Sequence, residues 1–424
     1  MRVCVLGLWH LGAVTAAALA EVGHQVTGLD FDARTVATLR TGSAPVFEPG
    51  LNELIGRGLA SQRLRFAAQL EELEDFDVLW VTYDTPVDEN DNADTSFVLA
   101  QIERALPAMS ADTLLLVSSQ LPVGTTRRLK HPRLACIPEN LRLGRAVKDF
   151  LHPKRIVAGV RSDRDRQTVL ELLSPITAAI EWMSLEAAEM TKHAINAFLA
   201  TSIVFANEIA SLCELVGADA KEVERGLKSD GRIGARAYLA PGGAFAGGTL
   251  ARDVAYLNDI SLERGLTTPL LSSVLPSNEL HGRWVRRQLQ TQFGHLAGTT
   301  VAVWGLAYKP GTDTLRRSLS VELCDWMIGQ GVSVRVHDPL VGDLPQHWAG
   351  VVTRCQDPMS AVQGADALVV ATEWPVYGTT AVAQLAGGPN RLVVLDANRF
   401  LPGLAAVASP YLQYFAVGTP RVDG

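Results

Sequence analysis

The sequence predicts an α/β protein with two doubly wound domains joined by a long central helix. Short apolar runs alternate with helical patterns from the N-terminus to about residue 184. A single helical stretch without Pro or Gly follows, Leu185–Val216, and strand–helix alternation resumes after residue 293. Continuous β-rich runs separated by helices are typical of parallel sheets covered on both faces.

The first segment, residues 1–184, begins with RVCVLG as a strand, GAVTAAALAEVG as a helix and QVTGLD as a second strand. Later strands are predicted at FDVLWVTY, TLLLVSS and LACIPEN. The first twenty residues superficially resemble a signal peptide. However, Gly7, His10 and Gly12 interrupt the apolar run, and we expect a strand, a loop and a helix there.

The middle segment, residues 185–290, is predicted to hold the long helix, which Gly217 stops, and to provide a dimer interface. The last segment, residues 291–424, is predicted to be a second doubly wound domain. Its strand-like runs are TVAVWGL, VSVRVHDP, ALVVATEW and RLVVLDA. The two α/β ends could therefore be structural repeats of one another.

Length and composition restrict the function classes. The 424 residues are too many for one core, and 47% hydrophobic with 20% charged residues is the balance of a soluble globular protein. A net charge of −7 disfavours non-specific nucleic-acid binding. The scattered cysteines lack a CxxC pair, which argues against disulfides and a zinc site: Cys4, Cys136, Cys213, Cys324 and Cys355. No apolar run of membrane length interrupts the chain, so we expect a cytoplasmic protein without a metal.

A glycine-rich turn predicts dinucleotide binding. Gly7-Leu-Trp-His-Leu-Gly12 follows the first strand and opens a helix, where a pyrophosphate would meet free backbone N–H groups, with His10 and Leu11 inside the turn. Trp9 occupies the place of the middle glycine, which weakens the pattern. Asp30 ends the second strand, where a carboxylate accepts bonds from ribose hydroxyls and repels a 2′-phosphate. We therefore expect NAD rather than NADP.

Seven further blocks line up in order along nearly the whole chain. They are GSAPVFEPGLNELI (42–55), TYDTPVDENDNADTSFV (82–98), LPVGTTRRL (121–129), PENLRLGRAVKDFLHPKRIVAG (138–159), KHAINAFLA (192–200), GLAYKPGTDTLRRS (305–318) and ATEWPVY (371–377). With this order and spacing the chain resembles the UDP-glucose/GDP-mannose dehydrogenase family. The resemblance implies two Rossmann-like domains and a homodimer, with NAD in the first domain and the nucleotide of a nucleotide-diphosphate sugar in the second. Family members oxidise a sugar CH2OH to a carboxylate in two hydride transfers, through a cysteine-bound intermediate.

The resemblance also implies roles for individual residues. Lys192 and Asn196 match the pair that holds the reacting oxygen; four residues apart on a helix, they share one face. Asp253 matches the acid near the reactive carbon, and Glu139 the glutamate that orients water or base. Further implied cofactor contacts are Thr85, Pro86, Ser119, Arg252 and Arg316. Implied substrate contacts are Asn140, Leu141, Arg232, Tyr238, Phe245, Gly247 and Lys309, with Arg232 reaching the partner subunit's substrate.

The chain departs from the family where the second oxidation takes place. In the stretch AFAGGTLARDVAYL, Thr249 stands where the family has its cysteine. A threonine hydroxyl has a far higher pKa than a thiol and forms no thioester. Gln120 replaces a family threonine, Asn140 a phenylalanine and Leu143 a glutamate. The residues for the first hydride transfer remain.

These departures favour an NAD-dependent nucleotide-sugar epimerase that oxidises a ring hydroxyl such as that at C4 and then reduces it from the other face. A variant would oxidise C6 and invert C5. The alternatives are a two-electron nucleotide-sugar dehydrogenase and, further away, a four-electron enzyme of the UDP-glucose 6-dehydrogenase type that uses Thr249. The non-enzyme alternative is a nucleotide-sugar sensor.

Overall fold

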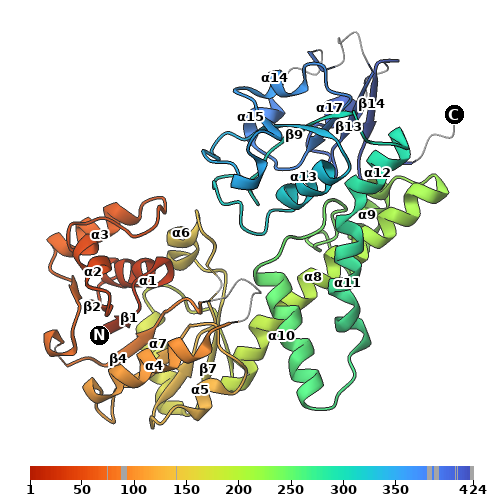
Figure 1. Ribbon diagram of the computed structural model, residues 1–424. Coiled ribbons are helices and arrows are strands. Elements are labelled where there is room, and N and C mark those ends of the chain that lie inside the picture. The colour runs from red at the N-terminus through yellow and green to blue at the C-terminus, as the bar shows by residue number, and fades with distance from the viewer. Residues whose placement is uncertain are drawn as a thin grey trace. The chain divides into compact units, whose positions relative to one another are not determined.

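The computed structural model describes residues 1–73, 75–86, 93–139, 141–379, 384–385, 391–405, 407 and 409–420. The chain forms two compact units, Met1–Ile195 and Asn196–Gly424, coloured red to yellow-green and yellow-green to blue in Figure 1. The division falls inside the long helix. The predicted three-part division at residues 184 and 290 stays a prediction.

The first unit is an eight-stranded sheet with helices. Its strands are β1 (Arg2–Leu6), β2 (Gln25–Leu29), β3 (Leu64–Ala67), β4 (Val78–Val81), β5 (Leu114–Val117), β6 (Leu134–Cys136), β7 (Ile156–Val160) and β8 (Ile180–Met183). Its helices are α1 (His10–Glu21), α2 (Ala33–Arg40), α3 (Leu51–Ala60), α4 (Thr95–Ala105), α5 (Thr125–Arg128), α6 (Ala146–Leu151) and α7 (Asp163–Leu173), with short 3₁₀ turns at Leu70–Glu72 and Leu106–Ala108. The strand order is β3-β2-β1-β4-β5-β6-β7-β8.

The central strand β1 is buried on both faces, as its apolar run predicts. Val3 and Val5 pack into one hydrophobic cluster, whereas Cys4 and Leu6 pack into a second one. The prediction of a parallel sheet needs one correction, because β7 runs antiparallel to β6. The connection between these strands holds only the six-residue helix α6 and returns the chain antiparallel.

The long helix α8 spans Leu185–Val216, with the bounds that the sequence predicts. Its first residues belong to the first unit and the rest to the second. By length and composition alone α8 could cross a membrane, but 44% of its most apolar window is buried inside the protein. The rest of that window is not buried, and it includes the exposed apolar side chain of Phe205.

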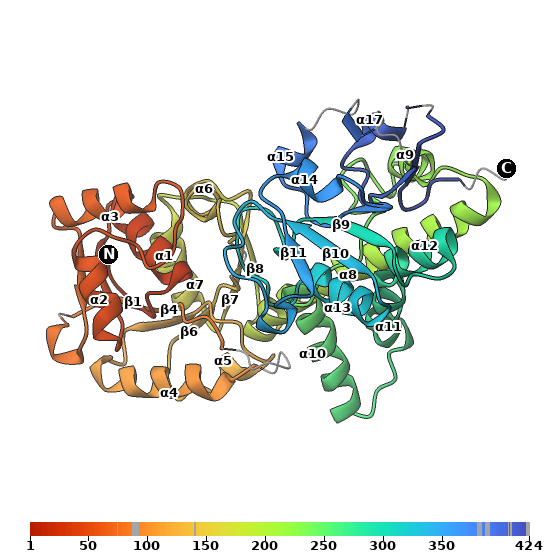
Figure 2. The same cartoon turned by 45° about the horizontal axis from the view of Figure 1, so that its top comes forward.

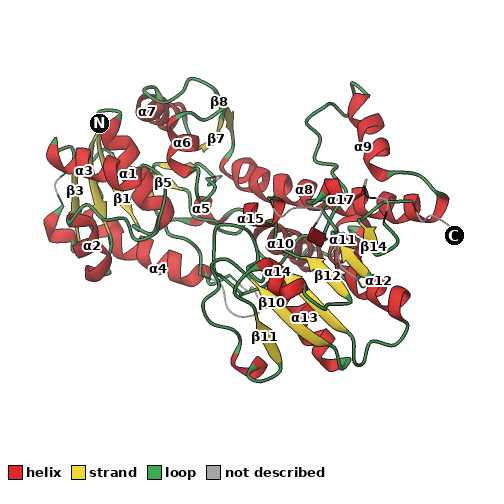
Figure 3. Ribbon diagram, turned by 90° about the horizontal axis from the view of Figure 1, so that it is seen from above, coloured by secondary structure: helices red, strands yellow, loops and turns green. Residues whose placement is uncertain are grey.

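The second unit carries helices and a six-stranded parallel sheet of order β11-β10-β9-β12-β13-β14. Its strands are β9 (Thr300–Trp304), β10 (Ser333–His337), β11 (Val352–Arg354), β12 (Ala367–Val370), β13 (Leu392–Leu395) and β14 (Leu412–Phe415). Its helices are α9 (Ala220–Ser229), α10 (Thr249–Glu263), α11 (Pro269–Gly282), α12 (Trp284–Phe293), α13 (Leu319–Gly329), α14 (Pro358–Val362), α15 (Pro375–Gly378) and α17 (Pro402–Ala405), with a 3₁₀ turn at Gln346–Trp348. Figure 2 shows β9, β10 and β11 side by side, and Figure 3 shows the strands in yellow.

The two sheets share a central topology, which confirms the prediction of two doubly wound, Rossmann-like units. Each has its first strand flanked by its second and fourth, the point where ligands bind in such folds. A glycine with a left-handed φ follows that strand in both units, Gly7 at 93° and Gly305 at 94°. Only glycine adopts such angles without strain.

Candidate active site

The glycine turn of the first unit has the backbone geometry of a phosphate cradle. A Cβ on Gly7 would lie 2.7 Å from the Tyr83 ring, and a Cβ on Gly12 would clash with the carbonyl oxygen of Gly7. The turn therefore needs both glycines to close against the start of α1. The backbone N–H groups at the start of a helix can donate hydrogen bonds to the oxygens of a pyrophosphate.

Trp9 and His10 give this turn an unusual form. Trp9 is the N-cap of α1 and its side chain is 51% exposed, so the indole stands in solvent beside the turn. His10 Nε2 lies 2.9 Å from Glu48 Oε2. The buried Glu48 also accepts the backbone N–H groups of Gly144 and Ala146, and so ties the turn to the segment before α6.

Asp30 lies at the end of β2, where the sequence places a ribose ligand. Its two oxygens each accept one backbone N–H, from Leu8 at 2.7 Å and from Asp32 at 2.9 Å. A carboxylate has about four acceptor positions, so Asp30 can still accept bonds from ribose hydroxyls.

The equivalent acid of the second unit, Asp338 at the end of β10, differs in this respect. It accepts five bonds: four from the backbone N–H groups of residues 306, 307, 340 and 341, and one from Trp374 Nε1. Burial by itself raises the pKa of Asp338. The backbone donors outweigh this effect, so the pKa lies below the ordinary aspartate value. Its acceptor positions are therefore taken. Of the two carboxylates, Asp30 is therefore the one with acceptor positions to spare, which fits the ribose contact that the sequence predicts.

The ends of β4 and β5 bring three predicted residues together in the first unit. Thr85 Oγ1 donates to the Gln120 carbonyl at 2.6 Å, and the neighbouring Ser119 is buried with no hydrogen-bond partner for its Oγ among the described residues. A buried hydroxyl without a partner fits a site that a polar ligand completes. Pro86, also predicted here, is exposed and accepts the N–H of Asp94.

Glu139 and Lys192 both lie in the first unit, and their charges interact. Burial raises the pKa of Glu139, an effect that Lys192 partly opposes. Glu139 Oε1 also accepts the N–H of Leu141, which places that predicted residue beside it. Asn140 lies outside the described residues.

A cavity of about 670 Å³ opens beside Glu139 in the first unit. Leu11, Leu141, Phe150 and Ile176 are among the apolar residues that line it. Leu11 itself is buried on α1. Arg142, Arg145 and Lys148 give this cavity a cationic rim. The cavity thus combines an apolar lining with cationic side chains, and Asp149, which also lines it, pairs with Arg142 and Arg145.

In the second unit, the Asn196 side-chain amide donates to Asp253 Oδ2 in a short hydrogen bond. Asp253 is 0% exposed and Asn196 8%. Asn196 follows Lys192 by one turn of α8, so the helix presents both on one face. The structure thus joins two of the three residues predicted to act on the reacting oxygen. Lys192 lies in the first unit, and its part in the same site stays a prediction.

Thr249 is the first residue of α10 and is exposed. Gly248 precedes it with φ 119° and ψ −144°, a conformation open to glycine alone. Arg252, predicted to contact the cofactor, is half-buried one turn further along α10. The loop thus has a constrained turn and an accessible hydroxyl but no thiol.

No cysteine elsewhere replaces the missing thiol. All five cysteines of the chain are buried, and burial raises the pKa of Cys4 to about 12. Burial likewise raises the pKa of Cys136, Cys213 and Cys324. A buried thiol with a raised pKa is a poor nucleophile.

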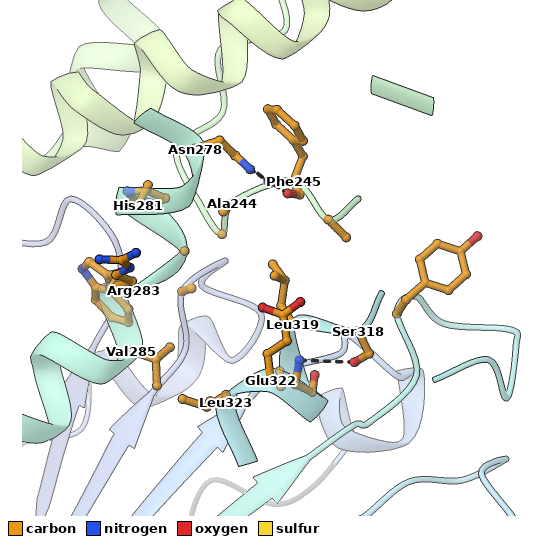
Figure 4. Close-up of a pocket in the computed structure, with 18 of the residues that line it drawn as sticks. Ala244, Phe245, Asn278, His281, Arg283, Val285, Ser318, Leu319, Glu322 and Leu323 are labelled. Carbon is orange, nitrogen blue, oxygen red and sulfur yellow. Dashed lines mark hydrogen bonds between the residues drawn. The ribbon is translucent and has the colours of Figure 1, made fainter. Parts of the chain in front are cut away.

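A second cavity, of about 430 Å³, lies within the second unit (Figure 4). Phe245 and Gly247 of the predicted substrate loop line it, together with the start of α13 and the ends of β12 and β13. A crevice at the carboxyl ends of parallel strands is where doubly wound folds bind nucleotides. Among the other predicted contacts, Tyr238 is 58% exposed, Arg316 is exposed, and Lys309 Nζ lies 5.4 Å from the Tyr308 ring centre.

Arg232 is predicted to reach into a partner subunit. Its side chain is 90% exposed and forms an ion pair with Asp230 at 2.7 Å. That exposure leaves it accessible to a second copy, and its role stays a prediction.

Comparison with known proteins decides the family. The sequence models of the UDP-glucose/GDP-mannose dehydrogenase family match as NAD-binding domain (residues 1–177), central domain (186–280) and UDP-binding domain (302–402). The chain belongs to this family. It uses NAD, and the glycine turn, Asp30 and Ser119 of the first unit fit that cofactor.

Relatives of similar length extend the comparison. The chain is 36% identical to the UDP-glucose 6-dehydrogenase of Pseudomonas aeruginosa, covering 99% of this chain and 98% of the relative. It is 33% identical to UDP-glucose 6-dehydrogenase YwqF of Bacillus subtilis, covering 100% and 98%. A solved UDP-glucose dehydrogenase from the archaeon Pyrobaculum islandicum has a TM-score of 0.83 at 30% identity, covering 99% and 98%. These relatives are named dehydrogenases and give no support to the epimerase hypothesis.

Sequence reasoning missed several polar residues that shape the site of this family member. Glu48 belongs to the family-like segment at residues 42–55, but its residue type alone predicts no role for it. Glu189, on α8, accepts from Gly124 N–H, Thr126 N–H and Thr126 Oγ1, and so anchors the loop after β5. Asn207 and Asn278 bind backbone far away in sequence. No local sequence pattern marks these two residues, because more than thirty residues separate each of them from the backbone group that it binds.

Proposed function

We propose that this protein is an NAD-dependent dehydrogenase that removes two electrons from a hydroxyl-bearing carbon of a UDP-sugar and releases the carbonyl product. The buried Asn196–Asp253 pair, together with Thr249 in place of a nucleophilic thiol, carries the proposal. The dehydrogenase names of the relatives and the UDP-binding domain at residues 302–402 support it.

The chain's own residues would divide the first oxidation among themselves. Lys192 and Asn196 hold the sugar oxygen by donating hydrogen bonds, which stabilises the negative charge that develops on it. Asp253 accepts the hydroxyl proton directly or through one water. Bound NAD would supply the hydride acceptor, so that an alcohol and NAD⁺ would become a carbonyl, NADH and a proton.

Thr249 explains why the reaction would stop there. A further oxidation of an aldehyde through a thioester needs a thiolate, and a threonine hydroxyl is not one at neutral pH. The buried cysteines do not supply one either. Leu143, which replaces a family glutamate, would act in the same direction because its side chain does not ionise.

Three other interpretations predict different product ratios. A four-electron UDP-glucose 6-dehydrogenase, as several relatives are named, would form two NADH per sugar oxidised. An epimerase acting at C4 would form an inverted sugar without net NADH, and a sensor would bind sugar and form neither.

The deciding experiment incubates the purified protein with NAD and UDP-glucose. NADH is measured by absorbance, and the sugar by NMR and mass spectrometry. We expect one NADH for each molecule of carbonyl sugar. Two NADH per uronic acid would replace the proposal by the four-electron reaction, and an epimer without NADH would replace it by the epimerase.

We also propose that the protein is a homodimer that pairs through α8. Phe198, Phe205 and Leu212 follow one another at seven-residue spacing, and their exposed fractions are 70%, 46% and 56%. An exposed apolar stripe on a helix is a common association surface. A cytoplasmic location stays a prediction from composition.

A further inference from the structure

Side chains from distant parts of the second unit hold the backbone of residues 242–245, the segment that leads into Gly247, Gly248 and Thr249. Asn207 Oδ1 accepts the N–H of Gly242 at 3.0 Å, and Asn207 Nδ2 donates to the carbonyl of Gly243. Asn398 Oδ1 accepts the N–H of Gly243 at 2.6 Å. His281 Nε2 lies 2.7 Å from the carbonyl of Gly242.

Asn278 completes this set with two bonds to one residue. Its Oδ1 accepts the N–H of Phe245 at 3.0 Å, and its Nδ2 donates to the carbonyl of Phe245 at 2.8 Å. Figure 4 shows the second of these bonds as a dashed line, with His281 on the same helix. A carboxamide is the side chain that offers a donor and an acceptor side by side.

The loop at residues 242–247 is not held by the hydrogen bonds of a helix or a strand. Residues 242–247 lie outside regular helices and strands, and two of them are glycines at the start of the segment. A Cβ on Gly242 would clash with Asn398 Oδ1, so glycine is needed there for the side chain to approach. Phe245 and Gly247 line the 430 Å³ cavity, and Thr249 follows them at the start of α10.

We infer that Asn278 is a positioning residue, which fixes the backbone of Phe245 and thereby sets both the nucleotide cavity and the approach to Thr249. Asn278 itself also lines this cavity, and the role we assign to it is exerted through its two bonds to the backbone of Phe245. The inference rests on the proposed function for the identity of the ligand. The effect of Asn278 on the loop does not depend on that function.

The two-point bond makes a specific demand on the chemistry of residue 278. In Asn278→Asp, a carboxylate accepts from Phe245 N–H but meets the Phe245 carbonyl with a second acceptor, so one bond becomes a repulsion. A protonated carboxyl again has one donor and one acceptor. The facing carbonyl disfavours the ionised form, so we expect the pKa of the introduced carboxyl to be raised above the ordinary aspartate value. The variant should therefore lose the loop geometry at high pH and regain it as the pH falls.

Other ionisable groups near this position lie on four helices and on the residue between α11 and α12. They are Glu279 and His281 on α11, Arg283 between the helices, Arg286 on α12, Glu322 on α13 and Glu208 on α8. They are present in wild type and variant alike. The ratio of the two affinities at each pH therefore reports the carboxyl at residue 278.

The experiment compares wild type, Asn278→Asp, Asn278→Ala and a control, Ser273→Ala. Ser273 is exposed on the same helix, and within the described part of the chain its hydroxyl bonds only to the local carbonyl of Leu270. UDP-glucose affinity is measured by calorimetry from pH 5.5 to 8, and hydrogen exchange is followed over residues 242–249. We expect Asn278→Ala to weaken binding about tenfold at every pH, the loss of two ordinary hydrogen bonds.

We expect Asn278→Asp to bind more weakly than Asn278→Ala at pH 8 and to regain affinity relative to wild type towards pH 5.5. Amide exchange at residues 242–249 should accelerate in step, and Ser273→Ala should match wild type. A variant that merely misfolds would not recover at low pH. Equal affinity of wild type and Asn278→Asp at pH 8, or one shared pH profile for both Asn278 variants, would overturn the inference.

Failure of the proposed function gives a different result. If wild type itself does not bind UDP-glucose, the proposed substrate class is wrong, and hydrogen exchange alone decides the role of Asn278. Unchanged exchange at residues 242–249 in Asn278→Ala would then reject it.

Discussion

Asn196 donates its side-chain amide to the carboxylate of Asp253, and the two side chains are buried together although 57 residues separate them. The bond orients a carboxylate that has no exposed surface in the second unit. A buried, oriented base removes a proton effectively because it needs no reorganisation when the reaction starts.

Asp253→Asn removes this base while preserving the size of the side chain. We expect the rate of NADH formation from UDP-glucose to fall at least about 100-fold, the usual contribution of a general base. The affinity for UDP-glucose, measured by calorimetry, should change little. Asp259→Asn, at an exposed position of the same helix, should keep the wild-type rate, and an active Asp253→Asn would exclude this carboxylate as the base.

Thr249 separates the first oxidation from a second one. Because its hydroxyl takes no part in the first step, Thr249→Ala should form NADH within about threefold of wild type, less than 1 kcal/mol of barrier. Thr249→Cys places a thiol at the start of α10, where the helix N-terminus lowers thiol pKa values. We expect the NADH yield per sugar to rise above one in that variant. A loss of all NADH formation in Thr249→Ala would show that the hydroxyl is essential.

Trp9 puts a Cβ at the point of the turn where a pyrophosphate approaches the backbone. Trp9→Gly should therefore bind NAD more tightly, by about tenfold, since phosphate approach is the role of a glycine at this position. Trp9→Ala removes the indole but keeps the Cβ and should resemble wild type. Fluorescence of bound NADH measures both, and weaker binding in Trp9→Gly would show instead that the indole contributes to affinity.

The apolar stripe on α8 predicts the oligomeric state. Phe205→Glu places a charge in the middle of this stripe, and burying an unpaired charge costs more than a dimer contact gains. Light scattering after gel filtration should show a dimer for wild type and a monomer for the variant. Val351→Glu, at another half-exposed apolar residue, is the control, and a dimeric Phe205→Glu would place the interface elsewhere.

Glu139 predicts a pH dependence of stability. Burial raises the pKa of its carboxyl, so the folded protein binds this proton more tightly than the unfolded chain. The contribution is present below the ordinary glutamate pKa and is lost as pH rises through the raised folded value. Glu139→Gln should therefore unfold at the same temperature as wild type near pH 4.5 and at a higher temperature near pH 8. Parallel unfolding curves at both pH values would contradict this.

The sequence predicted the parts of this fold that depend on local patterns. Apolar runs located the central strands, and the absence of Pro and Gly between residues 185 and 216 gave α8 its bounds. Gly7 and Asp30 were found because a phosphate turn and a ribose acid need fixed residue types at fixed spacing. The antiparallel strand β7 was missed, since strand direction depends on pairing partners that apolar periodicity does not reveal.

Within the site, residue type alone determined that the loop at Thr249 has no thiol and that the chain keeps Lys192, Asn196 and Asp253. Tertiary structure decided that Asn196 bonds to Asp253, and that Asn278 bonds to both the N–H and the carbonyl of Phe245. It also decided that the acceptor positions of Asp338 are filled, whereas those of Asp30 are not. The physical reason is range. Helix, strand and turn preferences act over a few residues, whereas a side chain finds its hydrogen-bond partner only after folding brings distant backbone within about 3 Å of it.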